Sequence, residues 1–124
     1  MRAESARVLV VEDDDDLRSL IGAALADAGY AAVEAPDGAA ALQACKERDV
    51  DVVLLDLNLP GLGGKDFVDA YRRGLGRAKI IVMSGAATGG ETSGRIHAAV
   101  FLSKPFGLDN LLGAVRRVLG SGTT

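Results

Sequence analysis

The chain has 124 residues, a length typical of one domain, and 48% of them are hydrophobic, which is enough for a buried core. Its net charge of -3 gives no electrostatic reason to expect nucleic acid, and no apolar run approaches the roughly 18 residues of a membrane span. The single cysteine, Cys45, excludes an internal disulfide, and no signal-peptide pattern precedes the first apolar run. We expect a single cytoplasmic domain over residues 1–124, with a core at about 6–119 and a frayed tail at 120–124.

Short apolar runs and helical patterns alternate along the chain. The apolar runs end at turn-forming or polar residues, which is typical of buried strands, and they cover residues 7–12, 30–35, 49–56, 78–83 and 99–103. Apolar residues at three- and four-residue spacing predict helices over residues 17–28, 39–48, 65–73, 86–97 and 108–119. Gly89, Gly90 and Gly94 weaken the fourth helix, because an internal glycine costs about 0.5–1 kcal/mol relative to alanine.

An acidic stretch separates the first strand from the first helix. Carboxylates suit a helix N-terminus, where they cap free N–H groups and favour the positive end of the dipole. We therefore expect Asp14, Asp15 and Asp16 to be solvated residues around this helix start. The helix is predicted to bury one apolar face, made of Leu17, Leu20, Ile21, Ala24, Leu25 and Ala28.

Strands that alternate with helices predict an α/β fold with a parallel sheet and helices on both faces. Right-handed crossovers leave few topologies, and the flavodoxin-like strand order 2-1-3-4-5 is the one we expect. Ligands of such folds bind at the carboxyl ends of the strands, at the switch point between the first and third strands. Asp13 and Asp56 would meet there.

Polar residues stand at the carboxyl ends of the predicted strands. Glu12 and Asp13 follow the first strand, Asp56 ends the third, Ser84 follows the fourth and Lys104 follows the fifth. Each alone has a structural explanation, as a capping acid, a turn residue or a surface lysine, since charged residues are mostly exposed. Their joint placement at one edge of the sheet favours a functional site instead.

Carboxylates that are close together repel one another, and a cation usually relieves the repulsion. Oxygen ligands without cysteine or histidine favour a hard ion, Mg²⁺ or Ca²⁺. Glu12 and Asp13 are the predicted carboxylate ligands. The backbone carbonyl of Asn58, in the turn after the third strand, could supply another oxygen.

A carboxylate, a metal ion, an ammonium group and a hydroxyl together suit phosphoryl transfer to a carboxylate oxygen. That reaction requires neutralised charge on the phosphoryl oxygens and an acceptor held in line. Asp56 is then the nucleophile that forms an aspartyl phosphate, and Lys104 and Ser84 bind phosphoryl oxygens.

The sequence resembles the receiver domain of bacterial two-component response regulators. The matching segments are residues 8–15 (VLVVEDDD), 51–61 (DVVLLDLNLPG), 80–85 (IIVMSG) and 101–106 (FLSKPF). The resemblance extends over residues 6–119 and implies the flavodoxin-like fold. It also implies a bound Mg²⁺, whose ligands are Glu12, Asp13, Asp56 and the Asn58 carbonyl.

The resemblance also implies how the domain works. Asp56 would accept a phosphoryl group from a histidine kinase or a histidine phosphotransfer protein. Ser84 and the aromatic Phe101 would then turn inward and change an output surface for protein partners, formed by the predicted elements at 86–97, 99–103 and 108–119. The peptide bond between Lys104 and Pro105 would be cis. Such a domain catalyses only its own phosphorylation and dephosphorylation, and it stands alone or belongs to a larger regulator or a hybrid histidine kinase.

Other classes of protein remain open from the sequence. A receiver fold could serve for docking without phosphorylation. A flavodoxin-like electron carrier is disfavoured, because residues 12–16 would repel a flavin phosphate and aromatic residues are only 4% of the chain. A Mg²⁺-dependent phosphohydrolase usually needs a second aspartate two residues after the nucleophile, where this chain has Asn58.

Overall fold

The computed structural model describes residues 6–57, 59, 63–74, 76–84 and 98–120. Its strands form one parallel sheet in the order β2-β1-β3-β4-β5, which confirms the predicted fold class and topology. The strands are β1 (Arg7–Val11), β2 (Ala31–Ala35), β3 (Val52–Asp56), β4 (Lys79–Ser84) and β5 (Val100–Ser103). The predicted helix at residues 86–97 lies outside the described residues.

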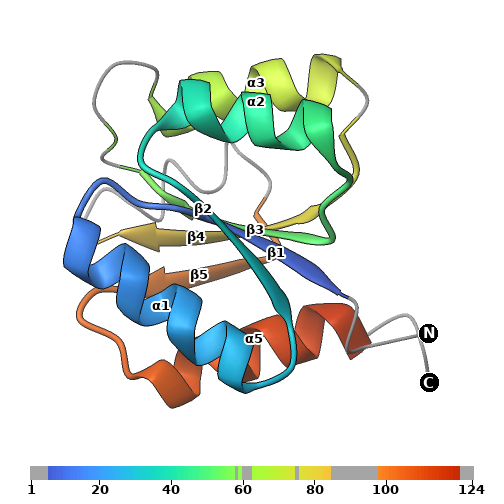
Figure 1. Cartoon of the computed structure of the whole chain (residues 1–124). Coiled ribbons are helices and arrows are strands. Elements are labelled where there is room, and N and C mark those ends of the chain that lie inside the picture. The colour runs from blue at the N-terminus through green and yellow to red at the C-terminus, as the bar shows by residue number, and fades with distance from the viewer. Residues whose placement is uncertain (1–5, 58, 60–62, 75, 85–97, 121–124) are drawn as a thin grey trace.

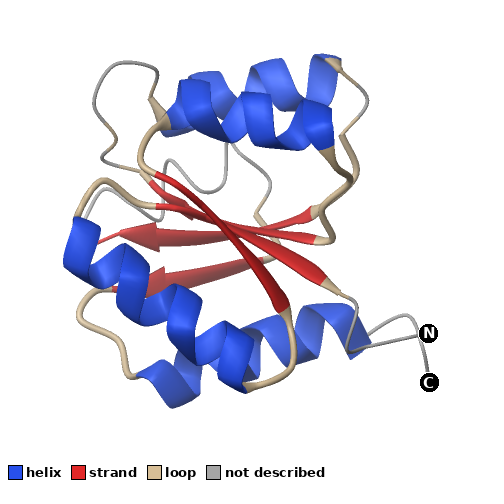
Figure 2. Cartoon of the chain, in the orientation of Figure 1, coloured by secondary structure: helices blue, strands red, loops and turns tan. Residues whose placement is uncertain are grey.

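The described helices cover both faces of the sheet. They are α1 (Asp15–Asp27), α2 (Gly38–Glu47), α3 (Gly64–Arg73) and α5 (Leu108–Gly120). Helices α2 and α3 lie on one face, and α1 and α5 lie on the other (Figures 1 and 2). None of the described helices is both long and apolar enough to cross a membrane.

Two aspartates cap helices through their side chains. Asp14 accepts a hydrogen bond from the Leu17 amide at 3.0 Å, and Asp37 accepts one from the Ala40 amide at 2.8 Å. Such caps satisfy N–H groups that have no partner within the helix. The acidic stretch before α1 therefore has the capping role that the sequence predicts, with Asp14, Asp15 and Asp16 exposed.

Strand β3 lies in the middle of the sheet and is buried along its whole length. Its side chains alternate between the two cores, as the period of a strand requires. Val53 and Leu55 pack in the core under α2 and α3, whereas Val52 and Leu54 pack in the core under α1 and α5. Asp56 is thus fixed at the end of a strand that both layers hold.

Two expectations about individual segments were wrong. The third strand begins at Val52 rather than at residue 49. Just before it, the Asp51 carboxylate accepts the Arg7 amide, the Asp51 amide donates to the Arg7 carbonyl, and the Asp49 carbonyl accepts the Arg7 guanidinium. Leu20 is 52% exposed and Ala28, the C-cap of α1, is exposed as well, although the spacing placed both on the buried face of this helix. The buried stripe centres on Ile21 and Leu25, and Leu20 lies about 100° around the helix from Ile21.

Candidate functional site

The carboxyl ends of the strands meet at one edge of the sheet. The register pairs Val11 with Leu55, Asp56 with Met83, and Ser84 with Ser103. The residues that end or follow β1, β3, β4 and β5 therefore lie side by side, at the edge toward which the arrows of β4 and β5 point in Figure 1. This is the edge where the sequence placed the site.

Three polar side chains are buried in the described part of the chain, and all three lie at this edge. Glu12 is 1% exposed, Asp56 is 2% exposed and Ser84 is 1% exposed. Burying an ionisable group is unfavourable unless partners compensate it, so a fold retains one mainly where the group has a use. The buried polar residues thus point to the same site as the sequence.

Lys104 joins the two buried carboxylates. Its ammonium lies 2.9 Å from Glu12 Oε1 and 3.4 Å from Asp56 Oδ2. The lysine side chain is 26% exposed, so its charge lies between the buried carboxylates and solvent. A small anionic group that approached Asp56 would meet this ammonium.

Glu12 is held at its backbone and at both carboxylate oxygens. Its amide donates to the Ala35 carbonyl at 3.1 Å, and its Oε2 accepts the Asp14 amide at 3.1 Å. Its Oε1 is the partner of Lys104, and its carbonyl accepts the Arg18 guanidinium at 2.8 Å. Few side-chain movements remain possible for this residue without breaking one of these bonds.

The protonation of the site reflects burial and charge together. Burial raises the pKa of Glu12 above its ordinary value, and the charge of Asp56 adds to this, although hydrogen bonds from Lys104 and Asp14 oppose it. Burial alone would lower the pKa of Lys104, but the hydrogen bond to Glu12 and the charges of Asp56 and Glu12 outweigh it and raise that pKa. The lysine therefore stays protonated.

The three predicted carboxylate ligands come together. Glu12, Asp13 and Asp56 each offer an oxygen, and these oxygens lie within 4.8 Å of one another. Two of the side chains are buried and Asp13 is exposed, so the cluster opens to solvent on one side. An all-oxygen donor set of this kind fits a hard divalent cation such as Mg²⁺. The carbonyl of Asn58, the fourth predicted ligand, lies outside the described residues.

The remaining predicted residues lie around this cluster. Ser84 ends β4 and is buried, and its carbonyl accepts the Lys104 amide at 2.8 Å. Phe101 on β5 is half-buried and packs against the core under α2 and α3. The peptide bond between Lys104 and Pro105 is cis, as the resemblance implies.

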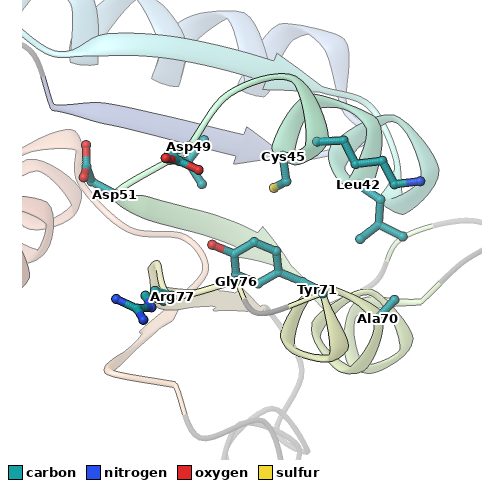
Figure 3. Close-up of a pocket in the computed structure, with 11 residues that line it drawn as sticks. Leu42, Cys45, Asp49, Asp51, Ala70, Tyr71, Gly76 and Arg77 are labelled. Carbon is teal, nitrogen blue, oxygen red and sulfur yellow. The ribbon is translucent and has the colours of Figure 1, made fainter.

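A pocket of about 680 Å³ lies at the opposite, amino ends of β3 and β4. Leu42 and Cys45 from α2 face Ala70 and Tyr71 from α3 across it (Figure 3). Burial raises the pKa of the Cys45 thiol to about 11, which keeps it in its unreactive form near neutral pH. The charged residues that line this pocket are exposed, so the pocket lacks the buried charges of the carboxyl edge.

Sequence reasoning did not identify Arg18, which contacts the site from α1. Its side chain is 15% exposed and lies between the backbone of Glu12, the Asp15 carboxylate and the Glu34 carboxylate. The three-residue spacing from Asp15 is a signal for an ion pair on a helix. No local pattern points to the contact with the Glu12 carbonyl, because that contact depends on how the loop folds back.

Comparison with known proteins gives a consistent result. The family model of the response regulator receiver domain matches residues 8–116. The transcriptional regulatory protein KdpE of Mycobacterium tuberculosis is 33% identical over 118 residues, which are 94% of this chain and 52% of that protein. The chain thus spans about half the length of this curated relative.

Solved structures agree in fold with this chain. Chemotaxis protein CheY4 of Vibrio cholerae superposes with a TM-score of 0.85 at 30% identity, covering 92% of this chain and 98% of CheY4. Response regulator protein TrrA of Thermotoga maritima, in complex with Mg²⁺-BeF, gives a TM-score of 0.81 at 29% identity, covering 91% of this chain and 98% of TrrA.

Proposed function

The chain belongs to the response regulator receiver family, and on that premise we propose that it is the phosphoacceptor domain of a two-component phosphorelay, with Asp56 as the acceptor. The observation that carries the proposal is the buried Asp56 at the end of the central strand, 3.4 Å from the Lys104 ammonium and beside two further carboxylates. Burial and the ion pair with Lys104 hold this carboxylate in a defined position, where an incoming phosphoryl group would also meet the ammonium.

In the proposed reaction an Asp56 oxygen attacks the phosphorus of a phosphohistidine. A P–O bond to Asp56 forms, the P–N bond to the donor imidazole breaks, and the imidazole nitrogen leaves with the bonding electron pair and takes up a proton. Lys104 neutralises charge on a phosphoryl oxygen, since its raised pKa keeps it cationic. Glu12 holds Lys104 in place at 2.9 Å.

Glu12, Asp13 and Asp56 would hold Mg²⁺ in this site, together with the carbonyl of Asn58. The ion would supply positive charge for the phosphoryl oxygens and relieve the repulsion among the carboxylates. The donor set of this chain supports the assignment, and so does the structure of TrrA, whose complex contains Mg²⁺-BeF.

Phosphorylation would alter the surface formed by residues 86–97, β5 and α5. It adds about −1.5 to −2 charges and three strong acceptor oxygens at the end of β3. The Ser84 hydroxyl would donate to one of these oxygens, and Phe101, which is now half-buried, would turn further inward. The active form is a shifted population, so part of it exists before phosphorylation.

The proposed partners are proteins. A histidine kinase or a histidine phosphotransfer protein would donate the phosphoryl group, and an output protein or a further part of the same chain would recognise the changed surface. We propose no activity on outside substrates, and no direct contact with nucleic acid or membrane. The curated relative KdpE, named as a transcriptional regulatory protein, is about twice as long as the part that this chain matches.

Intact mass after incubation with acetyl phosphate tests the proposal. The wild type is expected to gain one phosphoryl group in Mg²⁺ and none in EDTA. Asp56→Asn should gain none. Asp51→Asn is the matched control, because Asp51 lies just before the start of the same strand, at the opposite edge, and this variant should be phosphorylated like the wild type. No adduct in any condition would overturn the proposal and favour a docking module that works without phosphorylation.

A further inference from the structure

Arg18 connects three separate segments near the metal-binding carboxylates. Its guanidinium donates to the carbonyl of Glu12 at 2.8 Å, pairs with Asp15 at 2.5 Å, and lies 3.6 Å from the Glu34 carboxylate on β2. It is 15% exposed, so most of its surface is in contact with protein. The planar, multi-donor fork of arginine suits such a three-way contact better than the single ammonium of lysine.

The position of Glu34 fits this arrangement. A side-chain carbon added at Gly22 would come within 2.5 Å of Glu34 Oε2, so the carboxylate lies closely over α1 at a position without a side chain. Glu34 reaches across the helix toward Arg18 as a result. The guanidinium is thereby held from β2 as well as from its own helix.

The bond from Arg18 fixes the peptide between the two metal-binding acids of the β1–α1 loop. A peptide unit is planar, so fixing the direction of the Glu12 carbonyl also fixes the N–H of Asp13 and the course of the chain into that residue. The Glu12 amide is already bonded to Ala35 at 3.1 Å. With both of its backbone groups held, Glu12 can present its carboxylate, and direct that of Asp13, toward Asp56.

We propose that Arg18 is a positioning residue for the divalent cation: it holds the Glu12–Asp13 peptide so that both carboxylates converge with Asp56. The inference rests on the proposed function, because it assumes that these carboxylates bind Mg²⁺. It adds a residue that does not touch the ion and acts through the backbone.

Simple electrostatics gives the opposite expectation. Arg18 is a positive charge near a cation site, so its removal would tighten Mg²⁺ binding if charge alone mattered. If Arg18 positions the loop, its removal weakens binding, as loss of an outer partner of a metal ligand typically does by about 10- to 100-fold. The sign of the change therefore separates the two roles.

The experiment is a titration of the ¹⁵N-labelled protein with Mg²⁺ alone, followed by amide chemical shifts, for the wild type, Arg18→Gln and Arg18→Lys. Arg72→Gln is the matched control, because Arg72 also donates to a backbone carbonyl, that of Gly76 at 2.9 Å, but at the opposite edge of the sheet. Melting temperatures in EDTA identify a merely structural effect, which would lower stability without changing the dissociation constant of the folded protein.

We expect both Arg18 variants to bind Mg²⁺ about tenfold more weakly than the wild type, with Arg72→Gln unchanged. Unchanged or tighter binding by Arg18→Gln would overturn the inference. Wild-type affinity in Arg18→Lys would overturn the role of the three-way guanidinium contact, because a single ammonium would then hold the loop equally well. Absence of saturable Mg²⁺ binding by the wild type would instead overturn the metal assignment in the proposed function, and this inference with it.

Discussion

The two ends of the sheet differ in what they bury. The amino end has a pocket of about 680 Å³ whose charged lining residues, such as Asp51 and Arg77, are exposed (Figure 3). The carboxyl end has the buried polar residues Glu12, Asp56 and Ser84. Because an enclosed charge must be compensated by the fold, it marks a functional site more reliably than the size of a hollow does.

The largest effect that we predict concerns Cys45 at the amino end. Burial raises the pKa of this thiol from 9.0 to about 11. At pH 8 the folded protein should thus react with iodoacetamide about a hundredfold more slowly than a free thiol, because only the thiolate reacts. The rate should rise about tenfold per pH unit up to about pH 11, as the thiol ionises.

Mass spectrometry of the alkylated protein over a pH series measures this rate. The urea-unfolded chain is the control and should react like the free thiol. A folded protein that reacts as fast as its unfolded form at pH 8 would show that burial in the amino-end pocket does not suppress ionisation of the thiol, and the prediction would fail.

At the carboxyl end, Lys104→Met should lower the free energy of unfolding in EDTA by about 2 kcal/mol at pH 7, because it leaves two buried carboxylates without their cation. The loss is smaller than for a fully buried ion pair because the lysine side chain is 26% exposed. Since the fold raises the pKa of Lys104, this difference should persist from pH 7 up to about 10.5 and shrink as the pH rises above that value. Urea denaturation measures the change.

Lys65→Met is the matched control for that experiment. Lys65 pairs with Asp69 at 2.8 Å on the surface of α3, where its side chain is 49% exposed. An exposed pair of this type contributes about 0.3–0.5 kcal/mol. Equal losses of unfolding free energy in Lys104→Met and Lys65→Met would mean that burial does not strengthen the ion pairs of Lys104.

A smaller loss is expected from Tyr71→Phe at the amino end. The Tyr71 hydroxyl accepts the Ala78 amide at 2.9 Å, in a buried bond. Without it the amide lacks a partner, which should lower the free energy of unfolding by about 1–1.5 kcal/mol. Tyr30→Phe is the control, and a loss in Tyr71→Phe no larger than in that variant would contradict the prediction.

The smallest effect has the opposite sign. Asp56→Asn should raise the free energy of unfolding by about 1 kcal/mol in EDTA, because one of three mutually repelling carboxylates becomes neutral. In Mg²⁺ the wild type should instead be the more stable of the two proteins, since a ligand at one hundred times its dissociation constant stabilises the protein that binds it by about 2.7 kcal/mol. Thermal unfolding in EDTA and in Mg²⁺ measures the difference in stability between the two proteins under each condition. A variant that is less stable than the wild type in EDTA would contradict the predicted repulsion among the carboxylates.

The sequence was sufficient for the fold and for most of the site because both follow local patterns. The strand order follows from the alternation of strand and helix patterns and from the handedness of the crossovers. Because ligands of such folds bind at the carboxyl ends of the strands, this order then brings Glu12, Asp56 and Lys104 together. The same patterns misplaced Leu20, since a helical period does not define how wide the buried stripe is. The Arg18 contact depends on the path of a loop, which no periodicity encodes.

Strand β3 has a mechanical consequence. Its five residues are buried, it has a neighbouring strand on each side, and its side chains are anchored alternately in two cores. Strand β3 should therefore move little when a group is added at Asp56. Edge strand β5, with half-buried residues and one neighbouring strand, is the more compliant part, so a deformation that starts at Asp56 should emerge there.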